Sequence, residues 1–83
     1  MQEVTRWELI VSVSPRSGKN RLFVGGVWPD GKRRTSSAVV SVSPEGGVIT
    51  NSKSEYRLSG PDRFGESVQE ALASLGEWIP AGQ

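Results

Sequence analysis

The stretch Trp7-Glu8-Leu9-Ile10-Val11-Ser12-Val13 places apolar side chains at every second position, and only Ile10 breaks the alternation. Because successive side chains of a β-strand point to opposite faces, this period of two predicts a strand with one buried face. The segment 14–20 that follows is rich in Ser, Pro, Gly and Asn, which are turn-forming residues. We therefore expect a first strand over about residues 4–13.

Further segments with strand composition follow. We expect strands over about residues 20–28 and 33–43, separated by the turn Pro29-Asp30-Gly31. The pair Gly25-Gly26 inside the second strand indicates a bulge or the close approach of another backbone. Residues 47–51 and 54–59 form either the two arms of a hairpin or one long strand, and the sequence leaves both open.

After Gly60-Pro61 the apolar period changes to that of a helix. Phe64, Val68, Leu72 and Leu75 recur at helical spacing, which predicts an amphipathic helix over about residues 63–77, with Asp62 as its N-cap. Short connections favour pairing between sequence neighbours. The prediction is therefore an α+β fold: an antiparallel β-meander of four to five strands followed by one C-terminal α-helix packed on one sheet face. Residues 1–83 are expected to form a single domain.

Composition excludes several classes of chemistry. The chain has no Cys and no His, which removes disulfides, thiolate nucleophiles, His-based catalysis and nearly all zinc sites. The carboxylates are scattered, and the closest pair, Glu66 and Glu70, is expected on the solvated face of the helix. We therefore expect no enzyme activity, no cofactor and no metal ion.

The core of an 83-residue chain with 35% hydrophobic residues is expected to be marginal. We therefore expect a homodimer, and a monomer of low stability is the alternative. No uninterrupted apolar run exceeds three residues, so neither a transmembrane segment nor a signal-peptide core is predicted. We expect a cytoplasmic protein without a membrane partner.

The position of the charges is more informative than the net charge of +1. Six of the ten basic residues lie between positions 16 and 34, where only Asp30 opposes them, whereas acidic residues dominate after position 55. Such a surface attracts phosphate groups locally even when the net charge is small. The leading hypothesis is a nucleic-acid-binding module with a basic β-hairpin surface. Its candidate residues are Arg16, Lys19, Arg21, Lys32, Arg33 and Arg34. The alternative for Lys32–Arg34 is a solvated turn that protects a sheet edge.

A second hypothesis is protein recognition. One helix covers one sheet face, and Ile10, Phe23, Val39 and Ile49 have the parity expected for the open face. Such an apolar patch is typical of a partner surface, and Trp is enriched at interface hot spots. Phe23 and Trp28 are the candidate partner-binding residues. A small inhibitor or accessory factor of the phage or mobile-element type fits this interpretation.

Overall fold

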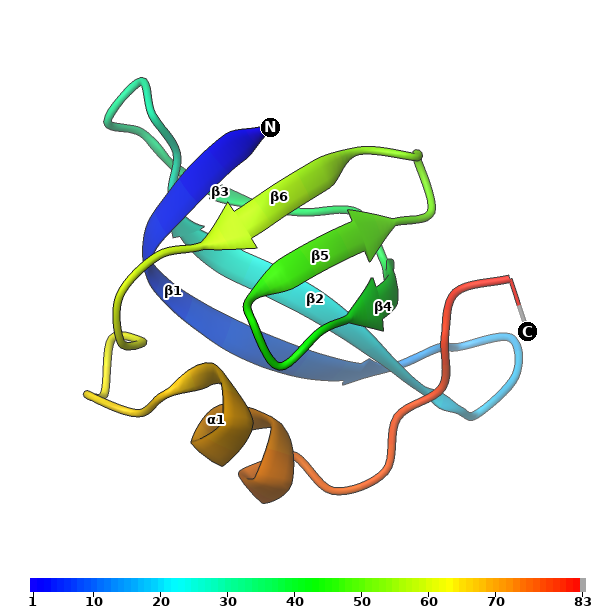
Figure 1. Ribbon diagram of the computed structural model, residues 1–83. Coiled ribbons are helices and arrows are strands. Elements are labelled where there is room, and N and C mark those ends of the chain that lie inside the picture. Colours follow the sequence, from blue (N-terminus) through cyan, green and yellow to red (C-terminus); the bar gives the residue numbers. More distant parts are fainter. Residues whose placement is uncertain (83) are drawn as a thin grey trace.

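The computed structural model describes residues 1–82, and this part of the chain forms a six-stranded sheet and one short helix (Figure 1). The fold is broadly α+β, as predicted. The strand order in the sheet is β3-β2-β1-β6-β5-β4. The elements are β1 Gln2–Val13, β2 Asn20–Val27, β3 Arg33–Thr35, β4 Val39–Val42, β5 Gly47–Thr50, β6 Glu55–Leu58 and α1 Val68–Ser74.

The long strand β1 belongs to both halves of the sheet. Its first residues pair in parallel with β6, and the residues from Glu8 onward pair antiparallel with β2. Between Thr5 and Glu8 the register shifts by one residue, and Arg6 adopts a positive φ of 45°. A bulge of this kind bends a strand, and here β4, β5 and β6 lie over β1 and β2 (Figure 1).

The core fills the space between these two layers. Val4 and Trp7 are both fully buried although they are three residues apart, because the bulge at Arg6 adds one residue between them. The strict alternation of inward and outward side chains therefore begins only after the bulge. At the end of the strand, the predicted inward residue Val13 is 60% exposed. The buried cluster consists of Val4, Trp7, Leu22, Val24, Trp28, Val39, Val48, Leu58, Val68 and Ala71.

The predicted antiparallel meander is wrong in two respects. The pairing of β1 with β6 is parallel, which makes the sheet mixed. The predicted strand over 33–43 is two strands, β3 and β4, which lie at opposite edges of the sheet. The break occurs at Ser36, whose hydroxyl accepts the Val24 N–H (3.0 Å) while its own N–H donates to the Val24 carbonyl (2.8 Å). After Ser36 the chain moves away from its neighbour β2 and crosses to β4 in the other layer.

Residues 47–59 form a hairpin rather than one long strand, which decides between the two alternatives. The strands β5 and β6 pair antiparallel, with Gly47 opposite Arg57. The turn is closed by the Thr50 N–H, which donates to the Ser54 carbonyl (3.0 Å), and Lys53 within it has a φ of 64°.

The helix is shorter than the predicted range 63–77 at both ends: residues 63–67 precede α1 without helical structure, and residues 75–77 follow its last residue, Ser74. Asp62 is not the N-cap: its Oδ1 accepts the N–H groups of Phe64 and Glu66 (both 2.8 Å). Ser67 caps α1 in a reciprocal pair of hydrogen bonds with Glu70, the capping box. Val68 and Ala71 are the buried residues of α1, so the helix covers one end of the core, and no helix in residues 1–82 is long and apolar enough to span a membrane.

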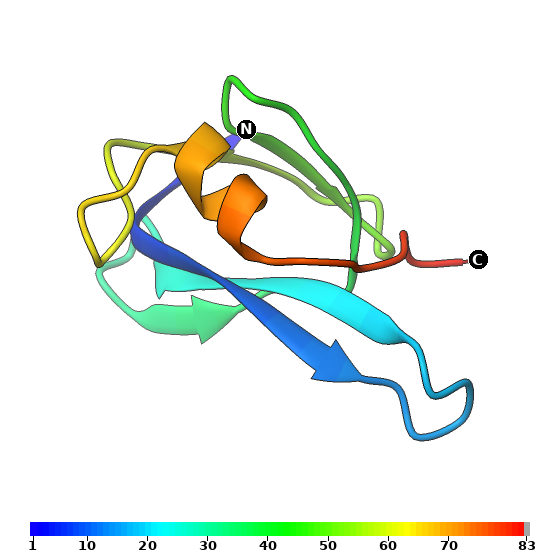
Figure 2. The ribbon, with the colours of Figure 1, turned by 90° about the horizontal axis from the view of Figure 1, so that it is seen from below.

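The segment after the helix closes the gap between the two layers (Figure 2). β3 pairs only with Gly25–Val27, which leaves the first half of β2 without a strand on that side. The Ile79 N–H donates to the Asn20 carbonyl on β2, and the Ala81 N–H donates to the Val39 carbonyl on β4 (both 3.0 Å). The C-terminal tail, residues 77–81, therefore joins two strands that do not pair with each other.

Candidate nucleic-acid interface

The structure separates the predicted basic residues into groups. Arg16 and Lys19 are exposed in the turn between β1 and β2, and Lys32–Arg34 lie at the other end of β2, where Arg33 pairs with Val27. At about 3.3 Å per residue, the eight-residue strand β2 places these groups roughly 25 Å apart. The six residues therefore do not converge on one point.

Arg21 lies between these groups and contacts the C-terminal tail. Its side chain is half-buried, and its Nη1 donates to the Pro80 carbonyl at 2.6 Å. The neighbouring Asn20 Nδ2 donates to the Glu77 carbonyl at 3.1 Å. Arg21 thus takes part in holding the tail against β2.

Arg33 lies with two arginines that the sequence interpretation left out. Arg6, Arg33 and Arg63 line one hollow of about 590 Å³, which we call the arginine hollow. Arg6 comes from the bulge in β1, Arg33 from the edge strand β3, and Arg63 from the turn before α1. The remaining lining residues are Thr5, Ser59, Pro61 and Asp62.

Backbone contacts bring these segments together. The Arg63 N–H donates to the Trp7 carbonyl (2.9 Å), and the Ser59 N–H donates to the Val4 carbonyl (2.9 Å). The Trp7 indole Nε1 donates to the Gly60 carbonyl at 3.1 Å. Residues 59–63 are thereby fixed to the bulge in β1, which places Arg63 beside Arg6.

The arginines of this hollow differ in their partners. Arg63 forms an ion pair with Glu8 at 3.3 Å, and its guanidinium lies 5.2 Å from the Phe64 ring centroid. Among the described residues, no carboxylate lies within ion-pair distance of Arg6 or Arg33. Asp62 adds one buried carboxylate to the wall, and it already accepts two backbone N–H groups. The hollow therefore has an excess of positive charge.

Arg34 points to the other side of β3, because successive residues of a strand face opposite ways. It forms an ion pair with Asp30, whose Oδ1 also accepts the Lys32 N–H at 2.9 Å. The Lys32 N–H, and after it the Arg34 guanidinium, hold the pKa of Asp30 below its ordinary value. Lys32 itself is exposed.

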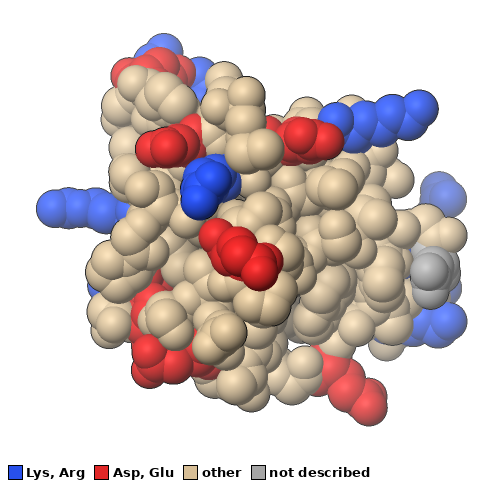
Figure 3. Space-filling view, viewed as in Figure 1, with Lys and Arg blue, Asp and Glu red and all other residues tan. Residues whose placement is uncertain are grey.

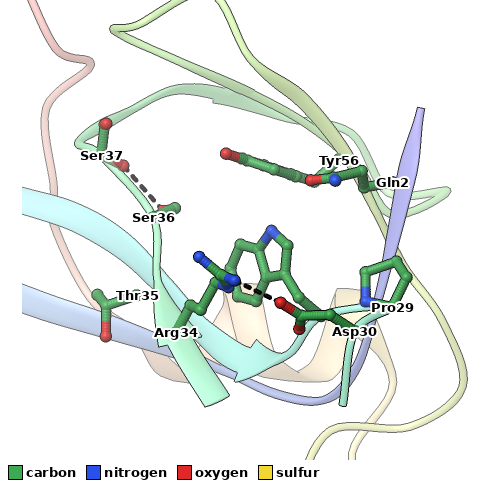
Figure 4. A pocket seen from close by; sticks show the side chains of 9 residues that line it. Gln2, Pro29, Asp30, Arg34, Thr35, Ser36, Ser37 and Tyr56 are labelled. Carbon is green, nitrogen blue, oxygen red and sulfur yellow. Dashed lines mark hydrogen bonds and ion pairs between the residues drawn. The ribbon is translucent and has the colours of Figure 1, made fainter. Parts of the chain in front are cut away.

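A second hollow, of about 390 Å³, lies on the Arg34 side of β3 (Figure 4), and we call it the Trp28 hollow. Trp28 is only 7% exposed and packs edge-to-face against Tyr56, with ring centroids 5.2 Å apart. The Arg34–Asp30 ion pair lies between Pro29 and Thr35 in the same view. The lining residues are Gln2, Trp28, Pro29, Asp30, Arg34, Thr35, Ser36, Ser37 and Tyr56.

The four apolar residues expected on an open sheet face do not form one patch. Val39 is fully buried in the core, which corrects its assignment to the surface. Phe23 is half-buried and lies opposite Ile10 in the β1–β2 pair, whereas Ile49 is 43% exposed on the other layer. The inner faces of the two layers meet at the core. Phe23 and Ile49 lie on the outer faces of different layers, so their side chains point away from each other. Phe23 and Trp28 therefore do not share one surface.

On the face seen in Figure 3, basic and acidic side chains are interspersed and no large area has a single sign. Within residues 1–82 no three acidic side chains come together in a way that would hold a metal ion. No protein family, curated protein or solved structure matches this chain. The two hollows on either side of β3 are therefore the candidate binding sites.

Proposed function

We propose that this protein binds nucleic acid through the arginine hollow, where Arg6, Arg33 and Arg63 contact phosphate groups. The observation that supports this function best is that three arginines from distant segments line one hollow. Arginine is suited to this role because its planar guanidinium binds phosphate oxygens in a bidentate manner.

The surroundings of the hollow also favour phosphate binding. All three residues of the edge strand β3 are exposed, so a polyanion reaches Arg33 without displacing protein. Arg63 is oriented by Glu8 and by the Phe64 ring, which reduces the entropy that it loses when it binds a phosphate. Contacts of this kind supply affinity and position but little sequence specificity.

The experiment is a titration of fluorescein-labelled DNA and RNA oligonucleotides followed by fluorescence anisotropy at a series of KCl concentrations. The variant Arg6→Gln/Arg33→Gln removes two charges and keeps the side-chain stems. Each lost phosphate contact flattens the slope of log K against log[salt] by about 0.7 for single strands or 0.9 for duplex. We therefore expect the slope to fall by about 1.4 to 1.8.

The matched control is Arg16→Gln/Lys19→Gln, which removes the same charge at the other end of β2. We expect this control to retain most of the affinity and the slope of the wild type. Equal losses in the two variants would show that charge alone, and not the arginine hollow, determines binding. No binding of any oligonucleotide at the lowest salt concentration would refute the function.

A further inference from the structure

We infer that the Trp28 hollow receives one unpaired base of the bound nucleic acid, so that the ligand is single-stranded at this site. The inference rests on the proposed function, because phosphate contacts at the arginine hollow would bring the strand to β3. The inference narrows the proposed ligand from nucleic acid in general to a strand with an unpaired base.

The Trp28 indole N–H has no protein partner in the described part of the chain. Trp28 is 7% exposed, and among the described residues its Nε1 donates to no acceptor. No buried side-chain nitrogen or oxygen of residues 1–82 lacks a partner, so this Nε1 is accessible to solvent. Trp28 lines the hollow, which makes its Nε1 a donor available to a ligand there. The Tyr56 hydroxyl is likewise without a protein partner in the described part of the chain.

The size and the polar groups of the Trp28 hollow suit a nucleobase. Its volume of about 390 Å³ lies within the range of about 300–1,000 Å³ that is usual for small-molecule sites. Tyr56, which is half-buried, supplies an aromatic ring for base stacking, which is tolerant of sequence, and the largely buried Trp28 packs against it. Gln2, Ser37 and the Arg34–Asp30 ion pair supply donors and acceptors for the edge of a base.

The charge of the wall favours a base over a cationic side chain. Asp30, the carboxylate that lines the hollow, is already paired with Arg34, so the wall offers a cationic side chain no free opposite charge. The Arg34 guanidinium lines the same hollow and would repel a second cation. A neutral planar ring avoids both difficulties.

The two hollows lie on either side of the strand β3. Arg33 lines the arginine hollow, and the next residue, Arg34, lines the Trp28 hollow. A nucleic-acid strand that crosses β3 would place phosphates on one side and a base on the other. A base inside a duplex is stacked and paired, so only an unpaired or extruded base reaches the second hollow.

The experiment compares three probes of equal length: a single-stranded oligodeoxynucleotide, the same backbone with abasic sites throughout, and a duplex. We expect the wild type to bind the base-containing single strand about tenfold or more tightly than the abasic strand, because base stacking on an aromatic side chain has roughly this effect. Tyr56→Ala and Arg34→Ala should each reduce this ratio. Tyr56→Phe, which keeps the ring, should preserve most of it.

The outcomes separate the two proposals. A wild-type ratio near one, together with abasic binding that Arg6→Gln/Arg33→Gln weakens, would overturn the base site and leave the phosphate function intact. Failure of all three probes to bind would overturn both. Since Tyr56 contacts the core residue Trp28, circular dichroism checks the fold of its variants. If Tyr56→Ala unfolds, Arg34→Ala still tests the Trp28 hollow, because Arg34 lies on the exposed edge strand β3.

Discussion

Gly26 lies so close to the bulge in β1 that a Cβ added to it would lie 3.0 Å from the Trp7 Cα. The same Cβ would lie 2.5 Å from Val4 Cγ1 and 3.0 Å from the Thr5 carbonyl oxygen. The absent side chain of Gly26 thus makes room for the bend of β1. That bend brings Arg6 to the surface and joins the two layers of the sheet.

The first prediction concerns this close approach. Gly26→Ala should destabilise the protein by about 1–3 kcal/mol, the usual cost of overpacking, because two of the three atoms that its Cβ would meet belong to the backbone. Urea unfolding followed by tryptophan fluorescence measures this change. Gly25→Ala is the control: its Cβ would meet the flexible end of Ile10 at 3.1 Å, and we expect a smaller loss. A larger loss for Gly25→Ala would contradict the assignment.

The second prediction concerns the C-terminal tail. Arg21→Met keeps the aliphatic stem but removes the hydrogen bond to the Pro80 carbonyl, so stability should fall by about 0.5–1.5 kcal/mol. The amides of Ile79 and Ala81, which bond to β2 and β4, should exchange with solvent faster. Hydrogen exchange observed by NMR measures both amides. Arg16→Met, in the exposed turn, should leave them unchanged, and equal effects of the two variants would argue against a role of Arg21 in holding the tail.

The third prediction concerns the titration of Asp30. Its folded-state pKa is lowered by the Lys32 N–H first and by Arg34 second. These contacts therefore favour the folded state above the unfolded pKa of about 3.9, and they are lost as the pH falls through the lower folded value. Arg34→Ala should raise the pKa of Asp30 only part of the way to its ordinary value, because the Lys32 N–H remains. NMR of the Asp30 carboxyl carbon measures this. Arg16→Ala should have no effect, and a full return to the ordinary value in Arg34→Ala would show that the backbone contact is unimportant.

Local signals in the sequence predicted the elements that depend on neighbours along the chain. The alternation up to Val13 and the turn at Pro29–Gly31 were sufficient for β1 and β2, and Gly25-Gly26 marked the close approach of a backbone. The parallel pairing of β1 with β6 could not be predicted in this way. It depends on a bulge at Arg6, and an arginine at a positive φ has no sequence signal of the kind that glycine gives.

The sequence does not predict the arginine hollow, because its three arginines lie far apart along the chain. The density of basic residues along the chain points to the segment 16–34, whereas Arg6 and Arg63 are isolated in the sequence. Their proximity depends on the hydrogen bonds between residues 59–63 and β1. The glycine at position 65 is the sequence signal that Arg63 lies in a turn and that the helix begins later. In the structure its φ is 84°, a value that glycine adopts readily.

The fourth prediction connects backbone strain with the candidate site. Arg6, at a φ of 45°, occupies the left-handed region, which costs a residue with a Cβ about 1 kcal/mol. Arg6→Gly should therefore stabilise the protein by up to about 1 kcal/mol, less the entropy that glycine gains in the unfolded chain. The same variant should weaken oligonucleotide binding, because it removes one guanidinium from the arginine hollow.

Lys53→Gly is the matched control for Arg6→Gly. Lys53 also has a positive φ, 64°, and its loss also removes one positive charge, but it lies in the β5–β6 turn and does not line the arginine hollow. Both variants should be stabilised in urea unfolding, and only Arg6→Gly should lose affinity in the anisotropy titration. Because the two changes are equal in charge and similar in strain, a difference in affinity reports the position of Arg6. Equal affinities would mean that a strained arginine is kept at the bulge for a reason other than phosphate binding.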